Sequence, residues 1–472
     1  MKAVWAVATA LLLAGCVAAQ REDPAGTLIE PQSLGLTGAA VVPPQTEWWK
    51  AFGDPQLDAL VDAAVHDNPS LAQALARVRM AQAQTRAAGA GNDPSLSIDV
   101  DQTRQRLSAN YTIPPPFGGG TYWVGQAAVN LHWDLDFWGR QAALIRQSRS
   151  QLAASTLDVA AARLALAGSI AQAYVDLYRS WEMLDIATRL QEQREHLLRL
   201  TQQRVNAGLD TQIELRIAES ALPQARAAKL RAQSARDLAT HRLAALVGYG
   251  ADRYAQIGRP QLSLDTALPL PDQLPIDLLA HRPDVLAARA RIDAAMAGRE
   301  AAHAAFYPDI SLKAFVGVQA IGLDRLMEGD SLMYGAGPAL HLPIFDAQRL
   351  RAGYQGATAE VDASVASYNA AVLNAVRETA DQISLNDSLG RQIDEVQRSL
   401  QAASAAYELA QARYGAGLAT QLVVLDAESR VLDARRELVT ASTSRVIARV
   451  SLLLMLGGSF DPATPVAAST GA

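Results

Sequence analysis

Apolar residues recur at two different spacings along the chain, and each spacing predicts one kind of element. Over residues 137–206 and 346–415 they return every three or four positions, which is typical of one face of a long α-helix. The seam of the first segment passes through Ile170, Tyr174, Leu177, Trp181 and Leu184. Shorter helices are expected over residues 70–92, 211–248, 283–306 and 420–456. The chain is therefore predicted to be mostly α-helical with a small β part.

Four shorter segments alternate between polar and apolar residues, which is the spacing of a β-strand. They are residues 95–101, 123–133, 310–316 and 332–342, the last of which alternates less cleanly and contains Pro338. Segments of about ten residues with this pattern are typical of transmembrane β-barrels, with the apolar side toward lipid and the polar side toward the lumen. Half-buried strands of a soluble sheet would give the same alternation, so both interpretations stand at this point.

Four strands are too few to close a barrel, since closed barrels begin at about eight strands. An open sheet in lipid would leave backbone groups at its two edges without hydrogen-bond partners. A membrane location therefore predicts that several chains share one barrel, and three chains would supply twelve strands. The stretches 104–120 and 319–331, which join the strands in pairs, would then be exposed loops.

A short peptide occurs twice in the chain, and it marks a larger duplication. Residues 204–220 read RVNAGLDTQIELRIAES and residues 413–429 read RYGAGLATQLVVLDAES, with nine of seventeen positions identical. The other elements repeat in the same order at nearly the same separation. The sequence therefore predicts two copies of one unit, a first repeat over residues 55–258 and a second over residues 259–458.

The predicted helix lengths do not suit a compact globule. At about 1.5 Å per residue, a helix of about 70 residues is roughly 105 Å long. The two shorter helices of a unit would together reach nearly the same length. One continuous helix lying beside two stacked shorter ones predicts a rod or the wall of a tube.

The repeated peptide has the residues of a sharp turn between two helices. Gly208 and Gly417 follow the long helices, where glycine adopts the left-handed conformation that ends a helix. Thr211 and Thr420 come three residues later, at the N-cap position of the next helix. Thr211 has Glu214 three residues further on and completes a capping box, whereas Thr420 lacks the acidic partner and is expected to make half of one.

Composition and charge narrow the function. The 472 residues carry a formal net charge of −6 without a basic run, so nucleic acid is not an expected partner. The chain has no His-Glu-x-x-His sequence and no cysteine pair, so the sequence predicts no metal site, no cofactor and no enzyme. Beyond the N-terminal segment no stretch reaches 18 consecutive apolar residues, so no transmembrane helix is expected.

The N-terminus predicts export. Lys2 precedes an apolar stretch over residues 4–13, and Leu-Ala-Gly then leads to Cys16, the one cysteine of the chain. This resembles a bacterial lipobox, in which the signal peptide is removed before a cysteine that becomes lipidated; an ordinary signal peptide with a chance cysteine is the alternative. The segments outside the repeats are thus predicted to be a signal peptide over 1–15, a lipidated extended segment over 16–54 and a disordered tail over 459–472.

Several motifs resemble the outer-membrane factors of efflux pumps. They are LDFWGR at 135–140, LPIDLLAHRPDVLAARARIDAA at 274–295, AAFYPDISL at 304–312 and GPALHLPIFDAQRLRA at 337–352. With the lipobox, the chain resembles the lipoprotein branch of this group, the NodT family, which is related to TolC. The resemblance covers nearly the whole mature chain. It implies a homotrimer, with a twelve-stranded barrel in the outer membrane and a long α-helical barrel in the periplasm.

The same resemblance implies partners and site residues. The partners are a periplasmic adaptor (membrane fusion) protein, an inner-membrane pump of the RND type and outer-membrane lipid. In the resembled family the adaptor meets the hairpin tips, which here contain Gly208, Thr211, Gly417 and Thr420. A carboxylate and an apolar residue just after one tip narrow the tunnel mouth, and the matching residues here are Asp426 and Leu422.

Three copies of Asp426 would ring the axis of a trimer, repel one another and attract cations. Arg430 lies four residues further along the same helix and is the expected partner of this carboxylate. The alternative is an exposed aspartate with a local arginine bridge and no role in a gate.

Together these features predict a passive exit duct in the outer membrane for small molecules such as drugs or toxic compounds, with the energy supplied by the pump. One alternative is a secretion duct for proteins, and another is a structural periplasmic coiled-coil lipoprotein without a pore. The alternating strands argue against the second alternative, because a rod needs no strands. The exported compound is left open, because a duct selects by size and charge more than by chemistry.

Overall fold

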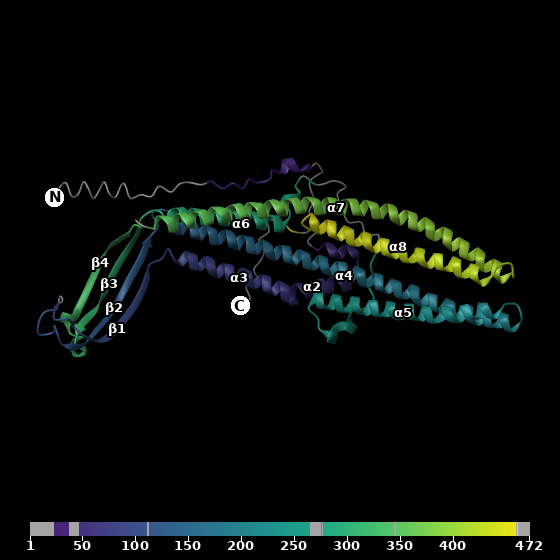
Figure 1. Cartoon of the computed structure of the whole chain (residues 1–472), viewed down its shortest axis with the longest axis horizontal. Helices are drawn as coiled ribbons and strands as arrows, with labels where there is room; N and C mark the ends of the chain where they lie inside the picture. The colour runs from purple at the N-terminus through teal and green to yellow at the C-terminus, as the bar shows by residue number, and fades with distance from the viewer. Residues whose placement is uncertain are drawn as a thin grey trace. The chain divides into compact units, whose positions relative to one another are not determined.

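A computed structural model of the chain describes residues 23–36, 47–110, 113–264, 275, 277–343, 346–458 and 460 (Figure 1). The predicted signal peptide over 1–15 and Cys16 lie outside the described residues, and so does the predicted tail over 459–472 apart from Phe460.

Seven α-helices make up most of the described chain. They are α2 (Pro55–Asp67), α3 (Pro69–Ala90), α4 (Arg140–Asn206), α5 (Gln212–Val247), α6 (Pro283–Ala304), α7 (Ala347–Gly415) and α8 (Gln421–Met455). Each of the six predicted helices is confirmed, with ends that agree to within three residues. The sequence analysis did not predict α2 as a separate helix.

Local chemistry explains why α2 and α3 are separate helices. The Asp54 side chain accepts a hydrogen bond from the Gln56 N–H at 3.0 Å and caps α2. Pro69 then begins α3, and the Asn68 side chain caps it by accepting the N–H of Ser70 at 2.8 Å. The buried face of α2 consists of Leu57, Leu60, Val61 and Ala64.

The four predicted strands form one antiparallel sheet in the order β1-β2-β3-β4 (Figure 1). The strands are β1 (Ser95–Arg106), β2 (Thr121–Leu135), β3 (Asp309–Ile321) and β4 (Leu332–His341). β1 continues beyond the alternating segment that predicted it, because the backbone goes on pairing with β2 after the apolar residues end. β3 also continues, to Ile321, and its alternation goes on through Val318 and Ala320. The connecting loops are correspondingly shorter than predicted.

Register aligns apolar residues from all four strands in rows on one face. Ile98 pairs with Val129, Val129 with Val316, and Val316 with Tyr334, so one apolar row crosses the whole sheet. Three of these four side chains are well exposed in the single chain, with Ile98 at 72% and Tyr334 at 78% of full exposure, and Val129 is half-buried. The sheet therefore has an apolar face that its own chain does not cover.

The chain divides into two compact units, and each unit combines residues from both halves of the sequence. The first unit, which includes residues 23–28, 77–155 and 288–368, contains the sheet and parts of α3, α4, α6 and α7. Its small core of buried side chains consists of Ile292, Ala295, Val361 and Val365.

The second unit comprises residues 29–76, 156–287 and 369–472 and holds the largest core. The predicted seam of α4 lies in this core: Ile170, Tyr174 and Leu177 are fully buried, and Trp181 packs against them. Two helices, α4 and α8, contain stretches long and apolar enough to cross a membrane by composition alone. Both contribute buried residues to this core, although only 33% and 39% of the two apolar stretches is buried in the single chain.

Candidate gate and hairpin tips

Two helical hairpins end in turns of identical geometry, one between α4 and α5 and one between α7 and α8 (Figure 1). Gly208 and Gly417 both have φ of 74°, in the left-handed region, as predicted. The N–H of Leu209 donates to the Arg204 carbonyl at 2.8 Å, and the N–H of Leu418 donates to the carbonyl five residues earlier at the same distance. Each long helix therefore ends in a Schellman motif, which satisfies its last carbonyls.

The helices that follow the two turns begin differently. The predicted capping box of Thr211 is confirmed: its hydroxyl accepts the N–H of Ile213 at 3.2 Å, and its own N–H donates to the Glu214 carboxylate at 3.0 Å. Thr420 occupies the N-cap of α8, but its side chain makes no capping hydrogen bond. The half cap predicted there is therefore absent, and the first turn of α8 has no side-chain support from this residue.

A network that the sequence analysis did not predict ties the first turn to the end of α7. The Arg204 guanidinium donates to both oxygens of Asp210, at 2.8 and 3.1 Å, and stacks over the Tyr414 ring 4.7 Å away. The Tyr414 hydroxyl also donates to Asp210 at 3.3 Å. Asp210 is thus held from two helices, and its hydrogen bonds raise the pKa of Arg204 above its already high value.

The three residues proposed from the sequence for a gate lie along one exposed stretch of α8. Leu422 is 65% exposed, although it is a large apolar side chain. Asp426 and Arg430 are 65% and 71% exposed, and the guanidinium donates to the carboxylate at 3.0 Å, which confirms the predicted pairing. Leu422 and Asp426 are one helical turn apart, so they present an apolar and a charged group side by side.

A second ion pair on α8, also not predicted, is buried. The side chains of Arg194, on α4, and Glu428 meet at 2.8 Å and are only 12% and 5% exposed. Burial raises the pKa of the Glu428 carboxyl, and the nearby guanidinium opposes that shift. Two turns toward the tip, Thr201 donates to the buried Gln421 side chain at 3.0 Å. These contacts fix α8 to α4 behind the exposed residues.

Comparison of the two repeat copies could have revealed the first of these two unpredicted sets, the network around Asp210. Asp210 and Tyr414 stand where the other copy has Ala419 and Val205, so each is specific to one copy. Glu428 gave no such signal, because the other copy also has a glutamate at the matching position, Glu219. Its burial depends on neighbours from α4 and is not a local property.

The apolar face of the sheet has the dimensions of a membrane-facing barrel wall. Trp123 and Trp133 lie on this face near the two ends of β2, ten residues apart. Ten strand residues span about 33 Å, or about 25 Å across a membrane at the tilt typical of barrels. Both indoles are partly exposed, at 43% and 37%, as expected of the aromatic girdles that border the lipid-facing band.

Comparisons with known proteins agree with this picture. The sequence model of the family "Outer membrane efflux protein" matches residues 60–249 and 274–458. The outer membrane protein OprJ of Pseudomonas aeruginosa is 33% identical over 470 residues, covering 97% of this chain and 96% of the relative. The fusaric acid resistance protein FusA of Burkholderia cepacia is 36% identical over 368 residues, covering 75% of this chain and 69% of the relative.

Solved structures show the same fold. The outer membrane protein VceC of Vibrio cholerae superposes with a TM-score of 0.83 at 34% identity, covering 89% of this chain and all of that one. The CmeC outer membrane channel of Campylobacter jejuni superposes with a TM-score of 0.85 over 94% of this chain, and at 22% identity it supports the fold alone. The chain belongs to the outer membrane efflux protein family, has the TolC-like fold and is an outer-membrane efflux channel.

Proposed function

We propose that three copies of this chain form one passive exit duct for small molecules in a tripartite efflux pump. The observation that carries the proposal is the open sheet with one continuous apolar face. β1 and β4 are its outer strands, and each has one edge without a partner strand in the described chain. Unpaired edges are not tolerated in lipid, so copies of the chain must pair β1 with β4 to close a barrel.

Electron microscopy of the detergent-solubilised protein, together with planar-bilayer recording, tests this proposal. We expect threefold tubes with a lumen and stable ion conductance after reconstitution. Monomers, or rods that conduct no current, would overturn the duct and favour a structural lipoprotein without a pore. A lumen wide enough to pass a folded protein domain would favour the alternative of protein secretion.

Within the trimer, Asp426 and Leu422 form the narrowest ring of the duct, and Arg430 holds the carboxylate in place. Their exposure in the single chain supports this role, because a gate residue must face open space and not the core. A ring of carboxylates favours cations, and a ring of leucines narrows the opening without charge.

The gate is tested by bilayer recordings of single substitutions. Asp426→Ala should lower the preference for cations over anions, and Leu422→Ala should raise the conductance. Asp433→Ala is the matched control, because Asp433 forms a similar exposed pair with Arg436 on the same helix. If the two gate variants and the control all conduct as the wild type does, the ring lies elsewhere.

The two hairpin tips serve as the docking site of the periplasmic adaptor, which connects the duct to an inner-membrane pump of the RND type. Leu209 and Leu418, next to Gly208 and Gly417, are 66% and 69% exposed and offer apolar contacts at both turns. Leu418→Arg should abolish efflux by the assembled pump while leaving the bilayer conductance unchanged. Loss of conductance in this variant would instead indicate damage to the channel itself.

We also propose that residues 1–15 are removed and that Cys16 carries the lipid, so that the duct is anchored as well as inserted in the outer membrane. The remaining segments of this proposal are the extended stretch 16–54, the repeats 55–258 and 259–458 and the tail 459–472. Intact mass spectrometry should find a mature chain that begins at Cys16 with added acyl mass. An unmodified N-terminus at another residue would refute the lipid anchor.

A further inference from the structure

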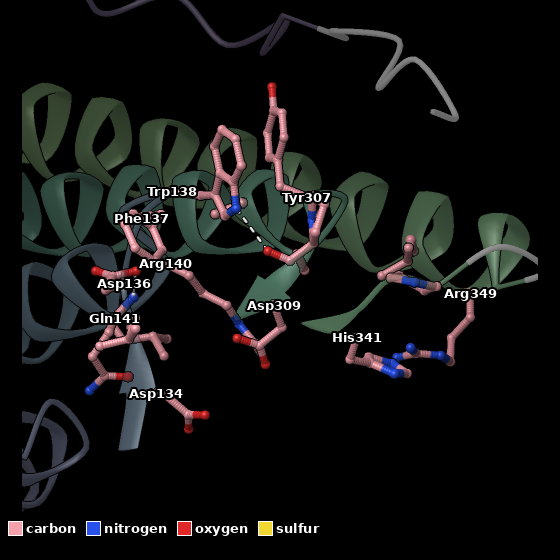
Figure 2. Close-up of a pocket in the computed structure, with 17 residues that line it drawn as sticks. Asp134, Asp136, Phe137, Trp138, Arg140, Gln141, Tyr307, Asp309, His341 and Arg349 are labelled. Atoms are coloured by element: carbon pink, nitrogen blue, oxygen red, sulfur yellow. Dashed lines mark hydrogen bonds between the residues drawn. The ribbon is translucent and has the colours of Figure 1, made fainter. Parts of the chain in front are cut away.

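A pocket of about 410 Å³ lies where the strands of the first unit meet its helices (Figure 2). The end of β2, the start of β3 and the end of β4 line it, together with the first turns of α4 and α7 and the end of α6. Among its lining residues, Leu135 belongs to the last apolar row of the sheet, in register with Ile310 and Leu340. The pocket therefore begins where the lipid-facing surface of the sheet ends.

An aromatic pair forms one wall of this pocket. The Trp138 and Tyr307 rings stack with centroids 4.9 Å apart and planes 17° from parallel. The indole N–H donates to the Pro308 carbonyl at 2.8 Å, shown as the dashed line in Figure 2. Both rings nevertheless stay exposed, at 50% and 40%. Exposed tryptophan and tyrosine at the edge of an apolar band sit at the level of lipid headgroups.

Most charges around the pocket already have partners. The Asp136 carboxylate accepts the N–H groups of Gln141 and Ala142, at 3.1 and 2.8 Å, and so caps α4. Asp134 pairs with His132 at 3.0 Å. The Asp136 carboxylate is therefore committed to the protein itself, whereas Asp134 is 53% exposed and contacts the half-exposed His132.

Two opposite charges remain without ion pairs. Arg140 and Asp309 both line the pocket and are exposed, and neither forms an ion pair with the other or with any other residue that the structure describes. A second cation at the rim, Arg349, pairs with the exposed Asp346 on its own helix at 2.8 Å, and exposed pairs of this kind contribute little to stability. The pocket thus offers one cation, Arg140, and one anion, Asp309, that form no ion pair with each other.

We propose that this pocket binds the headgroup of phosphatidylethanolamine. A phosphate with a primary ammonium two carbons away matches a guanidinium and a carboxylate that do not contact each other. Arg140 would take the phosphate, Asp309 the ammonium, and the acyl chains would lie on the apolar row that begins at Leu135. Three carboxylates, Asp134, Asp136 and Asp309, line the pocket against two guanidinium groups. This excess of negative charge favours the zwitterion over an anionic lipid, whose headgroup would face Asp309.

Native mass spectrometry of the full-length protein in detergent, titrated with short-chain lipids, tests the proposal. Dihexanoyl phosphatidylethanolamine should bind more tightly than dihexanoyl phosphatidylglycerol, and inorganic phosphate should bind only weakly. Arg140→Gln should weaken binding of the first lipid about tenfold, the loss expected for one charge-assisted hydrogen bond. Asp309→Asn should remove the preference for the zwitterionic lipid over the anionic one.

Arg149→Gln provides the matched control, because Arg149 is an exposed arginine of α4 that does not line the pocket. It should bind the lipid as the wild type does. The proposal would be overturned if the two lipids bound with equal affinity, or if inorganic phosphate bound as tightly as phosphatidylethanolamine. Equal losses of lipid affinity in Arg140→Gln and Arg149→Gln would also overturn it. Circular dichroism of each variant keeps a folding defect from being read as a loss of binding.

Discussion

The tip between α4 and α5 and the tip between α7 and α8 share a turn and differ in what surrounds it. Both end a long helix with a left-handed glycine and the same two backbone hydrogen bonds. The first tip then adds a capping box and the Arg204–Asp210 pair, whereas the second has neither. Duplication has therefore preserved the local geometry of the turn, while copy-specific side chains have specialised each tip.

The sharpest difference between the copies involves identical residues. Glu219 and Glu428 occupy the same position of the repeated peptide. Glu219 is 39% exposed and pairs with Arg216 on its own helix, whereas Glu428 is 5% exposed and pairs with Arg194 on another helix. The same side chain is thus a solvated surface group in one copy and part of an interior contact in the other.

Removing the arginine partner of each glutamate should produce the largest difference in stability between the two copies. Arg194→Ala leaves the Glu428 carboxylate buried without a cation, which typically costs about 3–5 kcal/mol in the free energy of unfolding. Arg216→Ala breaks an exposed pair, which is worth less than about 1 kcal/mol. Urea unfolding of the two variants in detergent, followed by circular dichroism, measures the difference.

The double variant Arg194→Ala with Glu428→Gln serves as a further test. It should recover much of the stability lost in Arg194→Ala, because no buried charge then remains unpaired. Equal losses of stability in Arg194→Ala and Arg216→Ala would mean that the pair of Arg194 with Glu428 contributes no more than a solvent-exposed pair.

Replacing each turn glycine should lower the free energy of unfolding by a smaller amount, and by the same amount in the two copies. Gly208→Ala and Gly417→Ala place a Cβ in open space, with no atom within 4 Å, so the cost comes from the left-handed backbone alone. That cost is about 1–2 kcal/mol for a residue with a side chain. Unfolding free energies that differ between the two variants would contradict the symmetry of the turns.

Substituting the two N-cap threonines should change the stability of the protein by unequal amounts. Thr211→Ala removes the hydrogen bonds of the capping box and should cost about 1 kcal/mol in the free energy of unfolding. Thr420→Ala should change it little, because that side chain caps nothing. Hydrogen exchange at the first turns of α5 and α8 provides the local measurement: faster exchange is expected in α5 of the first variant and no change in α8 of the second.

The features that were predicted from the sequence are the ones that depend on near neighbours along the chain. Gly208, Gly417 and the Thr211 capping box follow from residues within one or two helical turns. The burial of Glu428 could not be predicted in this way, because Glu219 has the same adjacent residues in the sequence. The guanidinium that pairs with Glu428 comes from Arg194 on α4, more than 200 residues away in the sequence, and Glu219 has no such partner from another helix in the part of the chain that the structure describes.

The sheet shows the same limit on local reasoning. Alternation predicted the segment 95–101, because one face of it is apolar. Residues 102–106 are all polar, yet they remain in β1 because β2 supplies their backbone hydrogen bonds. Pairing between strands extended an element that the side-chain pattern alone would have ended early.

The smallest effect on stability should come from the exposed pair on α8. Arg430→Ala breaks a contact with Asp426 that lies four residues away on the same helix, and such pairs contribute about 0.3–0.5 kcal/mol. Because the interior pair of Arg194 with Glu428 lies on the same helix, the two arginine variants compare a solvated contact with a buried one in nearly the same place. Urea unfolding should therefore show almost no change for Arg430→Ala, even where the ion selectivity of the channel changes. A loss of stability as large as that of Arg194→Ala would mean that Arg430 is buried in the assembled channel, and the exposed face of α8 would then be an interface and not the wall of a gate.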